Sequence, residues 1–404
     1  MRPGGLILIG LMAAAGSGAW AQDPLDRVSE ALTFSGFDHQ LRGRLSGIVD
    51  LEGYAFDQPA AGLIDSEDSP LFNPRLTMFL DVQAGDHVYL FAQGRVDRGF
   101  DPSAHAVEAR LDEYAIRVTP WLDGRVNFQA GQFATVIGNW VPRHLSWDNP
   151  FITAPVPYER LTAIYDTEAP ASVAQFVTID PDELYEYNPV LWGPIYATGA
   201  SVAGKIERFE YAAEIKNAGP SSRPASWNLE DVQFNHPTVA GRVGFSPDLR
   251  WTIGASASVG PYYRPEASAT LPPGQGIGDF RQILIGQDFR FEWHRFQIWA
   301  EVFETRFEVP NVGAADVLSY YLEGKYKFTP QFFGALRWNQ HFFGRVSDDT
   351  NGSVRWGEDI WRIDSSLGYR PSAHTQLKLQ YSIQQSLQTS DFSDIIAAQF
   401  TVRF

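Results

Sequence analysis

The sequence predicts an all-β fold, a 16-stranded antiparallel transmembrane β-barrel with a long third extracellular loop folded inward. Three observations predict it. Apolar and polar residues alternate with a period of two over stretches longer than a globular strand requires. Short and long connections join these stretches in turn, as they do in barrels of the outer membrane. Beyond the N-terminus, no apolar run approaches the ~20 residues of a membrane helix, so strands are the elements expected to cross a bilayer.

The N-terminus has the features of a secretory signal peptide. Arg2 precedes the apolar run Leu6–Gly16, and Ala19-Trp20-Ala21 has the A-x-A form of a cleavage site. An uncleaved membrane anchor is the alternative, but the apolar run is shorter than the ~20 residues that a spanning helix needs. The expected division of the chain is a signal peptide at 1–21, a periplasmic lead-in at 22–38 and the barrel at 39–404.

The composition and motifs of the chain exclude several kinds of catalytic and metal-binding site. The 404 residues include no cysteine, which excludes disulfides, thiol catalysis and cysteine-ligated metals. The formal net charge is −16, and no nucleic-acid partner is expected. The sequence has no G-x-S-x-G, no H-E-x-x-H and no phosphate-binding glycine loop. We therefore expect no enzyme activity, no catalytic residues, no cofactor and no metal site.

The first clear strand is His39–Phe56. Leu41, Val49 and Leu51 lie on one face of the alternation, with Arg42 and Asp50 on the other. Its length suits a membrane strand, which needs about 9–11 residues, better than a globular strand of about 5–6. The other predicted strands are 74–84, 88–97, 109–119, 125–135, 196–206, 208–216, 238–246, 250–260, 281–291, 295–307, 317–328, 331–343, 359–370, 375–386 and 394–404.

The connections between these strands fall into two sets. Seven short turns lie at 84–87, 120–124, 207, 247–249, 292–294, 329–330 and 371–374. Eight long loops lie at 57–73, 98–107, 136–195, 217–237, 261–280, 308–316, 344–358 and 387–393. This alternation predicts short turns and both termini at the periplasmic end, and long loops outside. The last strand alternates up to Phe404, and its terminal aromatic residue resembles the C-terminal signature of bacterial outer-membrane barrels.

Arginines mark the polar face of the first five strands, which should face the lumen. Guanidinium groups suit planar contact with carboxylate or phosphate, and arginines facing acids across a pore would set up a transverse field. The alternative is that arginines and acids pair with one another and brace the wall. The predicted pore-lining residues of these strands are Arg42, Arg44, Arg75, Arg95, Arg117 and Arg125, interspersed with Asp50, Glu52, Asp81, Asp97 and Glu113.

The connection 136–195 is too long for an ordinary loop and too aromatic for a disordered one. Its prolines stiffen it, which a constriction requires. Its aromatic and charged residues suit sugars, aromatic acids or an anion, although they could instead only attach the loop to the inner wall. The predicted constriction residues are Arg143, His144, Trp147, Asp148 and Arg160.

The segment Phe128-Gln129-Ala130-Gly131-Gln132-Phe133, followed by Ile137-Gly138 and the long loop, resembles the phosphate-selective porin family. That family forms sixteen-stranded trimers with inward loops and arginine-lined paths. Two features depart from it, the scarcity of lysine and the acidic net charge. The resemblance implies a homotrimeric porin of the bacterial outer membrane, surrounded by lipid and lipopolysaccharide. It would pass small hydrophilic solutes or ions, with anions such as phosphate as one candidate class.

Two other functions remain open. A barrel with a plugged pore would act as a scaffold, or as an adhesion or partner-binding protein, and would pass little current. An outer-membrane hydrolase would lose cleavage activity when one serine or histidine is replaced, although no spacing in the sequence indicates a catalytic triad.

Overall fold

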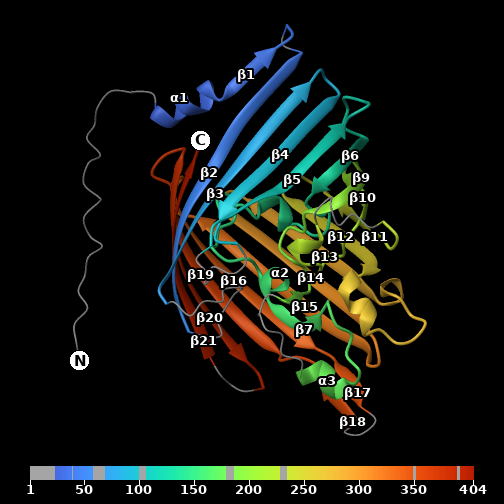
Figure 1. The fold of residues 1–404 in the computed structure, drawn as a ribbon. Coiled ribbons are helices and arrows are strands. Elements are labelled where there is room, and N and C mark those ends of the chain that lie inside the picture. Colours follow the sequence, from blue (N-terminus) through green and yellow to red (C-terminus); the bar gives the residue numbers. More distant parts are fainter. Residues whose placement is uncertain are drawn as a thin grey trace, which may run out of the picture.

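The computed structural model describes residues 23–38, 40–57, 69–99, 106–178, 186–227, 234–348, 352–388 and 392–404. The predicted signal peptide lies outside these ranges and stays a prediction. Within the described residues, sixteen antiparallel strands form one closed barrel (Figure 1). They are β2 (Leu41–Phe56), β3 (Leu71–Ala84), β4 (Val88–Asp97), β5 (Glu108–Val118), β6 (Asn127–Phe133), β9 (Ala197–Ile206), β10 (Phe209–Lys216), β11 (Thr238–Phe245), β12 (Trp251–Pro261), β13 (Arg281–Trp293), β14 (Phe296–Val309), β15 (Gly313–Lys327), β16 (Phe332–Phe343), β19 (Ile360–Tyr369), β20 (Thr375–Ser386) and β21 (Phe392–Arg403).

The barrel closes where the last strand pairs with the first. In the β2–β21 register, Val49 lies opposite Val402 and Phe56 opposite Ile395. Two backbone hydrogen bonds extend this seam, from Gly47 N to Phe404 O (3.1 Å) and from Phe404 N to Gly47 O (3.0 Å). Neighbours in the barrel are neighbours in sequence, except that loops carrying extra strands separate β6 from β9 and β16 from β19. The predicted fold class is confirmed.

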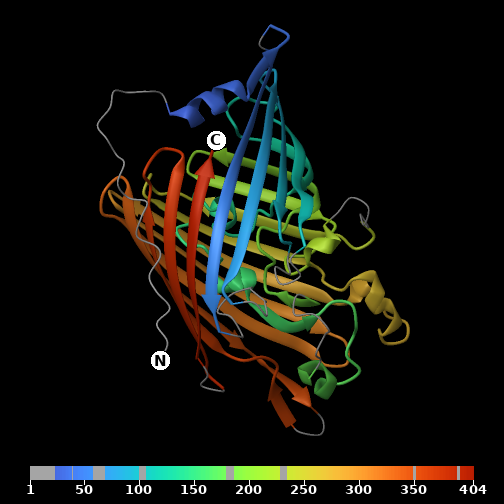
Figure 2. The ribbon, with the colours of Figure 1, turned by 60° about the vertical axis from the view of Figure 1, so that its left-hand side comes forward.

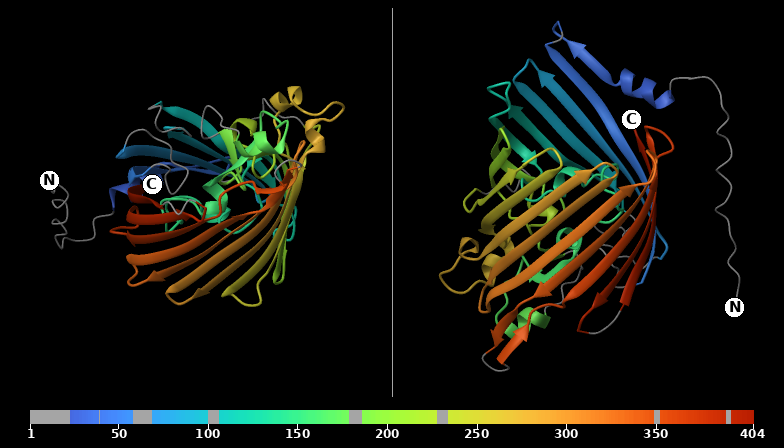
Figure 3. Two further views of the ribbon diagram at one scale, coloured as in Figure 1. Left: turned by 90° about the horizontal axis from the view of Figure 1, so that it is seen from below. Right: turned by 180° about the vertical axis from the view of Figure 1, so that it is seen from behind.

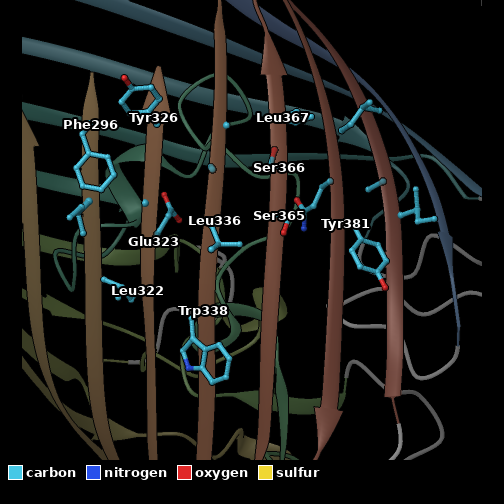
Figure 4. A pocket seen from close by; sticks show the side chains of 18 residues that line it. Phe296, Leu322, Glu323, Tyr326, Leu336, Trp338, Ser365, Ser366, Leu367 and Tyr381 are labelled. Atoms are coloured by element: carbon cyan, nitrogen blue, oxygen red, sulfur yellow. The ribbon is translucent and has the colours of Figure 1, made fainter. Parts of the chain in front are cut away.

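The wall has the polarity of a membrane barrel rather than of a soluble protein. Outward-facing Val243 and Ile396 are 61% and 60% exposed, whereas inward-facing Arg337 and Asp364 are 0% exposed. Figure 4 shows part of the outer surface over β14–β16 and β19–β21, where apolar side chains such as Trp338 surround a hollow of about 930 Å³. This hollow faces away from the lumen. No helix in the described ranges is long and apolar enough to cross a membrane.

The predicted lead-in contains two ordered elements, α1 (Pro24–Ala31) and β1 (Thr33–Gly36). The Asp23 carboxylate accepts a hydrogen bond from the backbone N–H of Leu25 (3.1 Å), and Pro24 occupies the first helical position. β1 pairs with the beginning of β2. Figure 2 shows α1 at the barrel end where the C-terminus lies. We call this end, to which the short turns belong, the short-turn end.

The long loop runs from residue 134 to residue 196, between β6 and β9. Much of its described part lies inside the barrel when viewed along the barrel axis (Figure 3), whereas residues 173–178 lie at the end away from the C-terminus, beside residues 345–348 (Figure 1). The sequence predicted it as an irregular connection, but it contains η2 (Val141–Arg143), α2 (Val156–Glu159), β7 (Leu161–Tyr165), α3 (Val173–Thr178) and β8 (Tyr187–Pro189). Other long loops carry η4 (Pro224–Ser226), η6 (Pro265–Ala269), η7 (Ile277–Asp279) and the hairpin of β17 (Arg345–Asp348) and β18 (Gly352–Arg355).

Replacing Gly131 by alanine is expected to cost about 1–3 kcal/mol of stability, the usual range for a strained backbone conformation. Gly131 lies in β6 just before the long loop, with a φ of +138°, and a Cβ there would collide with the Tyr114 carbonyl and approach Ala115 Cα to 2.7 Å. Urea unfolding in detergent micelles measures the change. Gly53→Ala is the control, because its Cβ would meet nothing within 4 Å. Equal midpoints for the two variants would contradict the expectation.

Candidate functional site

A buried lysine of the barrel wall holds the middle of the long loop. Lys378 on β20 is 1% exposed, and its Nζ donates to the carbonyl oxygens of Ser146 (2.8 Å), Asn149 (3.1 Å) and Phe151 (2.9 Å). An ammonium group has three donors and no acceptor, so these three carbonyls use its full capacity. The loop backbone from 146 to 151 therefore wraps around a single cation of the wall.

The next loop residues bind two neighbouring wall side chains. Gln380 on β20 accepts from the backbone N–H groups of Ile152 (2.5 Å) and Thr153 (3.2 Å). Arg337 on β16 donates to the carbonyls of Thr153 (3.1 Å) and Ala154 (2.9 Å). These contacts satisfy backbone groups that an irregular segment would otherwise leave unpaired inside the protein.

A buried ion cluster holds α2. Arg362 on β19 pairs with Glu159 of α2 and donates through Nη2 to the Ala154 carbonyl (2.5 Å). Asp364 lies between two guanidinium groups, with Arg337 Nε at 2.8 Å and Arg362 Nε at 3.1 Å. Burial raises the pKa of the Glu159 carboxyl, and the charge of Arg362 opposes that shift. Removing one member of such a cluster would strand a buried charge.

The first segment of the long loop is held by two carboxylates. Glu301 on β14 accepts from the backbone N–H groups of Asn139 and Trp140 (3.0 Å) and from the hydroxyl of Tyr158 (2.8 Å). On β15, Glu323 accepts from Arg143 Nη1 (2.6 Å). Together with the preceding contacts, these attach the loop to the wall from β14 to β20.

The later part of the long loop meets the other long loops. Asp166 pairs with Arg223, and the backbone N–H of Ala169 donates to Thr270 Oγ1 (2.8 Å). Asn311 donates to the Pro170 carbonyl (2.9 Å). The loop end of the barrel is therefore covered on this side, and one of the spaces left in the lumen lies along the opposite wall.

That space is a cavity of about 270 Å³ between the long loop and the wall from β2 to β5. The wall side is charged. Arg75 Nη2 lies 3.1 Å from Asp50 and 2.5 Å from Glu52, and Arg95 Nε lies 2.9 Å from Asp112. The loop side is rich in aromatic side chains, including Trp140, His144, Tyr158, Trp192 and Tyr196, and its one carboxylate, Glu159, is paired with Arg362.

The ion pairs therefore run along one wall rather than across the pore. This is the bracing arrangement that the sequence left open, and it does not create the transverse field that was the other possibility. Each cavity arginine already has a carboxylate partner. The cavity consequently combines a polar, internally neutralised face with an aromatic face.

His144 is neutral at physiological pH. Its Nδ1 lies 2.6 Å from the Val141 carbonyl, so Nδ1 carries the proton and Nε2 accepts from the Tyr196 hydroxyl (2.7 Å). Burial lowers the pKa of His144 to about 4; the hydrogen bond to Val141 opposes this shift, whereas the charges of Arg95 and Arg75 add to it. The imidazole therefore stays uncharged beside the arginines of the wall.

Acidification is expected to weaken docking of the long loop between pH 6.5 and pH about 4. An undocked His144 would bind a proton with the ordinary pKa of 6.5, whereas the docked one does so only near 4. Protons therefore favour the undocked loop in this window, and the effect levels off below it. Glu159 has the opposite effect on docking. Because burial raises the pKa of its carboxyl in the docked loop, protonation of Glu159 favours the docked loop as pH falls.

Tryptophan fluorescence against pH measures this transition, since Trp140 and Trp147 lie on the long loop. The difference between wild type and His144→Gln isolates the histidine from the carboxyl background. His87→Gln, in an exposed short turn, is the control. Superimposable titrations of wild type and His144→Gln would contradict the assignment.

The structure distributes the eleven predicted pore residues over several places. Arg75, Arg95 and His144 line the cavity beside β2–β5, and Arg143 and Asp148 line a second one at the short-turn end. Trp147 packs against the wall, with the guanidinium carbons of Arg403 and Arg370 at 3.9 Å and 4.6 Å from its ring centroid. Arg160 is half-buried at the end of α2.

The remaining four arginines lie at the short-turn end and are exposed. Arg44 donates to Ser29 Oγ (2.8 Å), and Arg117 donates to Gln129 (2.7 Å). Arg42 is at the start of β2. Arg125 precedes β6, in a turn, where it pairs with Asp123 (2.9 Å). The predicted strand began at 125, two residues before the strand in the structure, which explains why Arg125 was assigned to the wall.

Sequence reasoning missed the anchoring side chains of the second half of the barrel. Their signal was present, since each lies at a polar position of an alternating strand. What the alternation cannot show is that these groups bind the long loop or one another instead of water or solute. The missed anchors are Glu301, Glu323, Arg337, Arg362, Asp364, Lys378 and Gln380.

No protein-family model and no curated protein sequence matches this chain. Its fold is similar to solved outer-membrane structures. OmpF of Salmonella typhi, in complex with daunomycin, is 10% identical over 92% of this chain and 100% of that chain, with a TM-score of 0.57. The anion-selective porin of Comamonas acidovorans is 10% identical over 90% and 100%, also at 0.57. The channel DcaP of Acinetobacter baumannii is 10% identical over 92% and 100%, at 0.53.

These similarities establish a shared porin fold. They do not distinguish the phosphate-selective family from other porins, and no sequence match supports that family in particular.

Proposed function

We propose that this chain is a porin of the bacterial outer membrane that allows passive diffusion of small hydrophilic solutes. One observation carries the proposal: a closed barrel with an apolar outer surface encloses a polar lumen that a firmly attached loop narrows without filling. A diffusion channel needs a wet path of limited bore and no catalytic group.

The proposed path follows the β2–β5 wall. Solutes would pass between the paired charges of that wall and the aromatic side chains of the long loop. Polar edges and aromatic faces together suit sugars or aromatic acids. Because the arginines here are neutralised by neighbouring carboxylates, this cavity offers little support for phosphate selectivity.

The apolar belt would contact outer-membrane lipid and, at the loop end, lipopolysaccharide. A homotrimer is the proposed assembly, supported by the porin fold; one solved structure with this fold, OmpT of Vibrio cholerae, is described in a trimer form. Mass photometry of the detergent-solubilised protein tests it, because a monomer and a trimer differ threefold in mass.

Single-channel recording in a planar bilayer tests the channel. The intact protein is expected to conduct, and a variant lacking residues 140–190 is expected to conduct several-fold more, because the deletion removes the segment attached across the lumen. A variant lacking the exposed loop residues 273–276 is the control and should match wild type. Absence of current from both the intact protein and the 140–190 deletion would replace the porin by a plugged scaffold or partner-binding barrel.

A further inference from the structure

A second cavity, of about 490 Å³, lies in the lumen at the short-turn end. The loop segment around 138–148 contributes to the linings of both cavities and lies between them. Six side chains that line the second cavity are cationic and four are acidic, an excess of two positive charges in a chain whose net charge is −16. Three of the cations, Arg143, Arg242 and Arg290, already have a carboxylate partner, and the other three do not.

The group on β11 and β13 is paired. Arg242 donates to both carboxylate oxygens of Asp288 (2.8 Å each) and to Glu210 (2.6 Å). Arg290 lies 2.7 Å from Glu292. Fork-to-fork contact of this kind uses most donors of a guanidinium group. This side of the cavity has little capacity left for an additional anion.

The other group consists of Lys325, Lys327 and Arg370, and we call it the basic triplet. It has no carboxylate partner. Lys325 and Lys327 are two residues apart on β15, so they share a face, with Cα atoms roughly 7 Å apart. Among the described residues, no carboxylate lies within 4.0 Å of any of the three. Glu323 on the same strand and Asp148 on the long loop act on Lys325 as opposite charges from a greater distance, whereas Arg370 and Lys327 act on it as like charges.

Lys325 is the central member. It is 6% exposed, and its Nζ lies over the ring of Phe333, 4.2 Å from the centroid. That ring occupies the space above Gly368, where any Cβ would collide with it. The ammonium group is thus held by an aromatic face, and its N–H donors have no described hydrogen-bond acceptor. A largely buried cation in this state is stabilised by an anion that supplies both charge and acceptors.

Arg370 is a cation whose guanidinium group is held in one orientation by hydrogen bonds. Its Nε donates to Gln376 (2.6 Å) and its Nη2 to the Trp147 carbonyl (2.6 Å). These bonds orient the guanidinium group at the cavity wall and leave Nη1 available. A rigid fork beside two ammonium groups matches the charge and acceptor geometry of a tetrahedral or planar oxyanion.

We propose that the basic triplet binds a small oxyanion, a phosphate, sulfate or carboxylate, at the short-turn mouth of the lumen. This deepens the proposed function by naming a solute class, and it places recognition at the mouth opposite the long loops. Binding itself does not depend on conduction, so the two proposals can fail separately.

Isothermal titration of the detergent-solubilised protein with inorganic phosphate tests the site. Wild type is expected to bind, and Lys325→Gln/Lys327→Gln to bind at least tenfold more weakly. Lys325→Arg, which keeps the charge, should retain binding. Lys205→Gln is the matched control, because Lys205 is exposed at the same barrel end but does not line this cavity. Equal affinity of the double variant and wild type would overturn the proposal, as would absence of binding to wild type.

Bilayer recording separates this proposal from the channel itself. Phosphate added at the short-turn side is expected to reduce chloride current at lower concentration than phosphate added at the loop side, and the double variant should lose this asymmetry. A protein that conducts but shows no asymmetry and binds no phosphate would remain a porin without this site. A protein that binds phosphate through the triplet but does not conduct would retain the site and lose the porin function.

Discussion

Replacing Arg362 by methionine is expected to lower the free energy of unfolding by about 3–5 kcal/mol, the usual cost of breaking a buried ion pair. Arg362 is 1% exposed and joins β19 to α2 through Glu159 and the Ala154 carbonyl. Methionine keeps much of the side-chain volume but leaves Glu159 buried without its main cation. Urea unfolding in micelles, followed by fluorescence, measures the loss.

Arg306→Met is the matched control. Arg306 pairs with Asp316 at 2.7 Å, but both side chains are about half exposed, so the loss should be much smaller than for Arg362→Met. The double variant Glu159→Gln/Arg362→Met should recover part of the stability, because the stranded charge is then removed as well. If Arg362→Met costs no more than Arg306→Met, the buried cluster does not hold the loop.

Replacing Lys378 by methionine is expected to release the middle of the long loop and to raise single-channel conductance several-fold, with larger current noise. The Asn149 and Phe151 carbonyls lose the ammonium donor that holds them, whereas Ser146 keeps a second donor in Gln376 (3.0 Å). Buried carbonyls without donors are costly, which favours a loop that moves into water. Planar-bilayer recording measures the change.

Lys216→Met separates loss of a buried lysine from loss of loop anchoring. Lys216 is 2% exposed and donates to Phe133 at the end of β6, away from residues 146–151. We expect lower stability from this control but an unchanged conductance. Equal conductance of Lys378→Met and wild type would show that this anchor does not set the bore.

The strand pattern was predictable because the bilayer acts on every strand in the same local way. One face must be apolar and the other polar, so alternation marks each strand without knowledge of its neighbours. The predicted strand 375–386 coincides with β20, and 39–56 differs from β2 by two residues. The N-terminal helix was missed, although Asp23-Pro24 has the form of a helix start.

The sequence by itself therefore determined the barrel, the number and order of its strands and the existence of one exceptional loop, because these depend on local polarity and length. Only the tertiary structure decided how that loop is attached and which charges remain unpaired. Lys378 and Ser146 are 232 residues apart, and Lys325 meets Phe333 through strand register. Such pairings depend on which side chains face one another across a closed lumen, and a period of two carries no information about partners on the opposite wall.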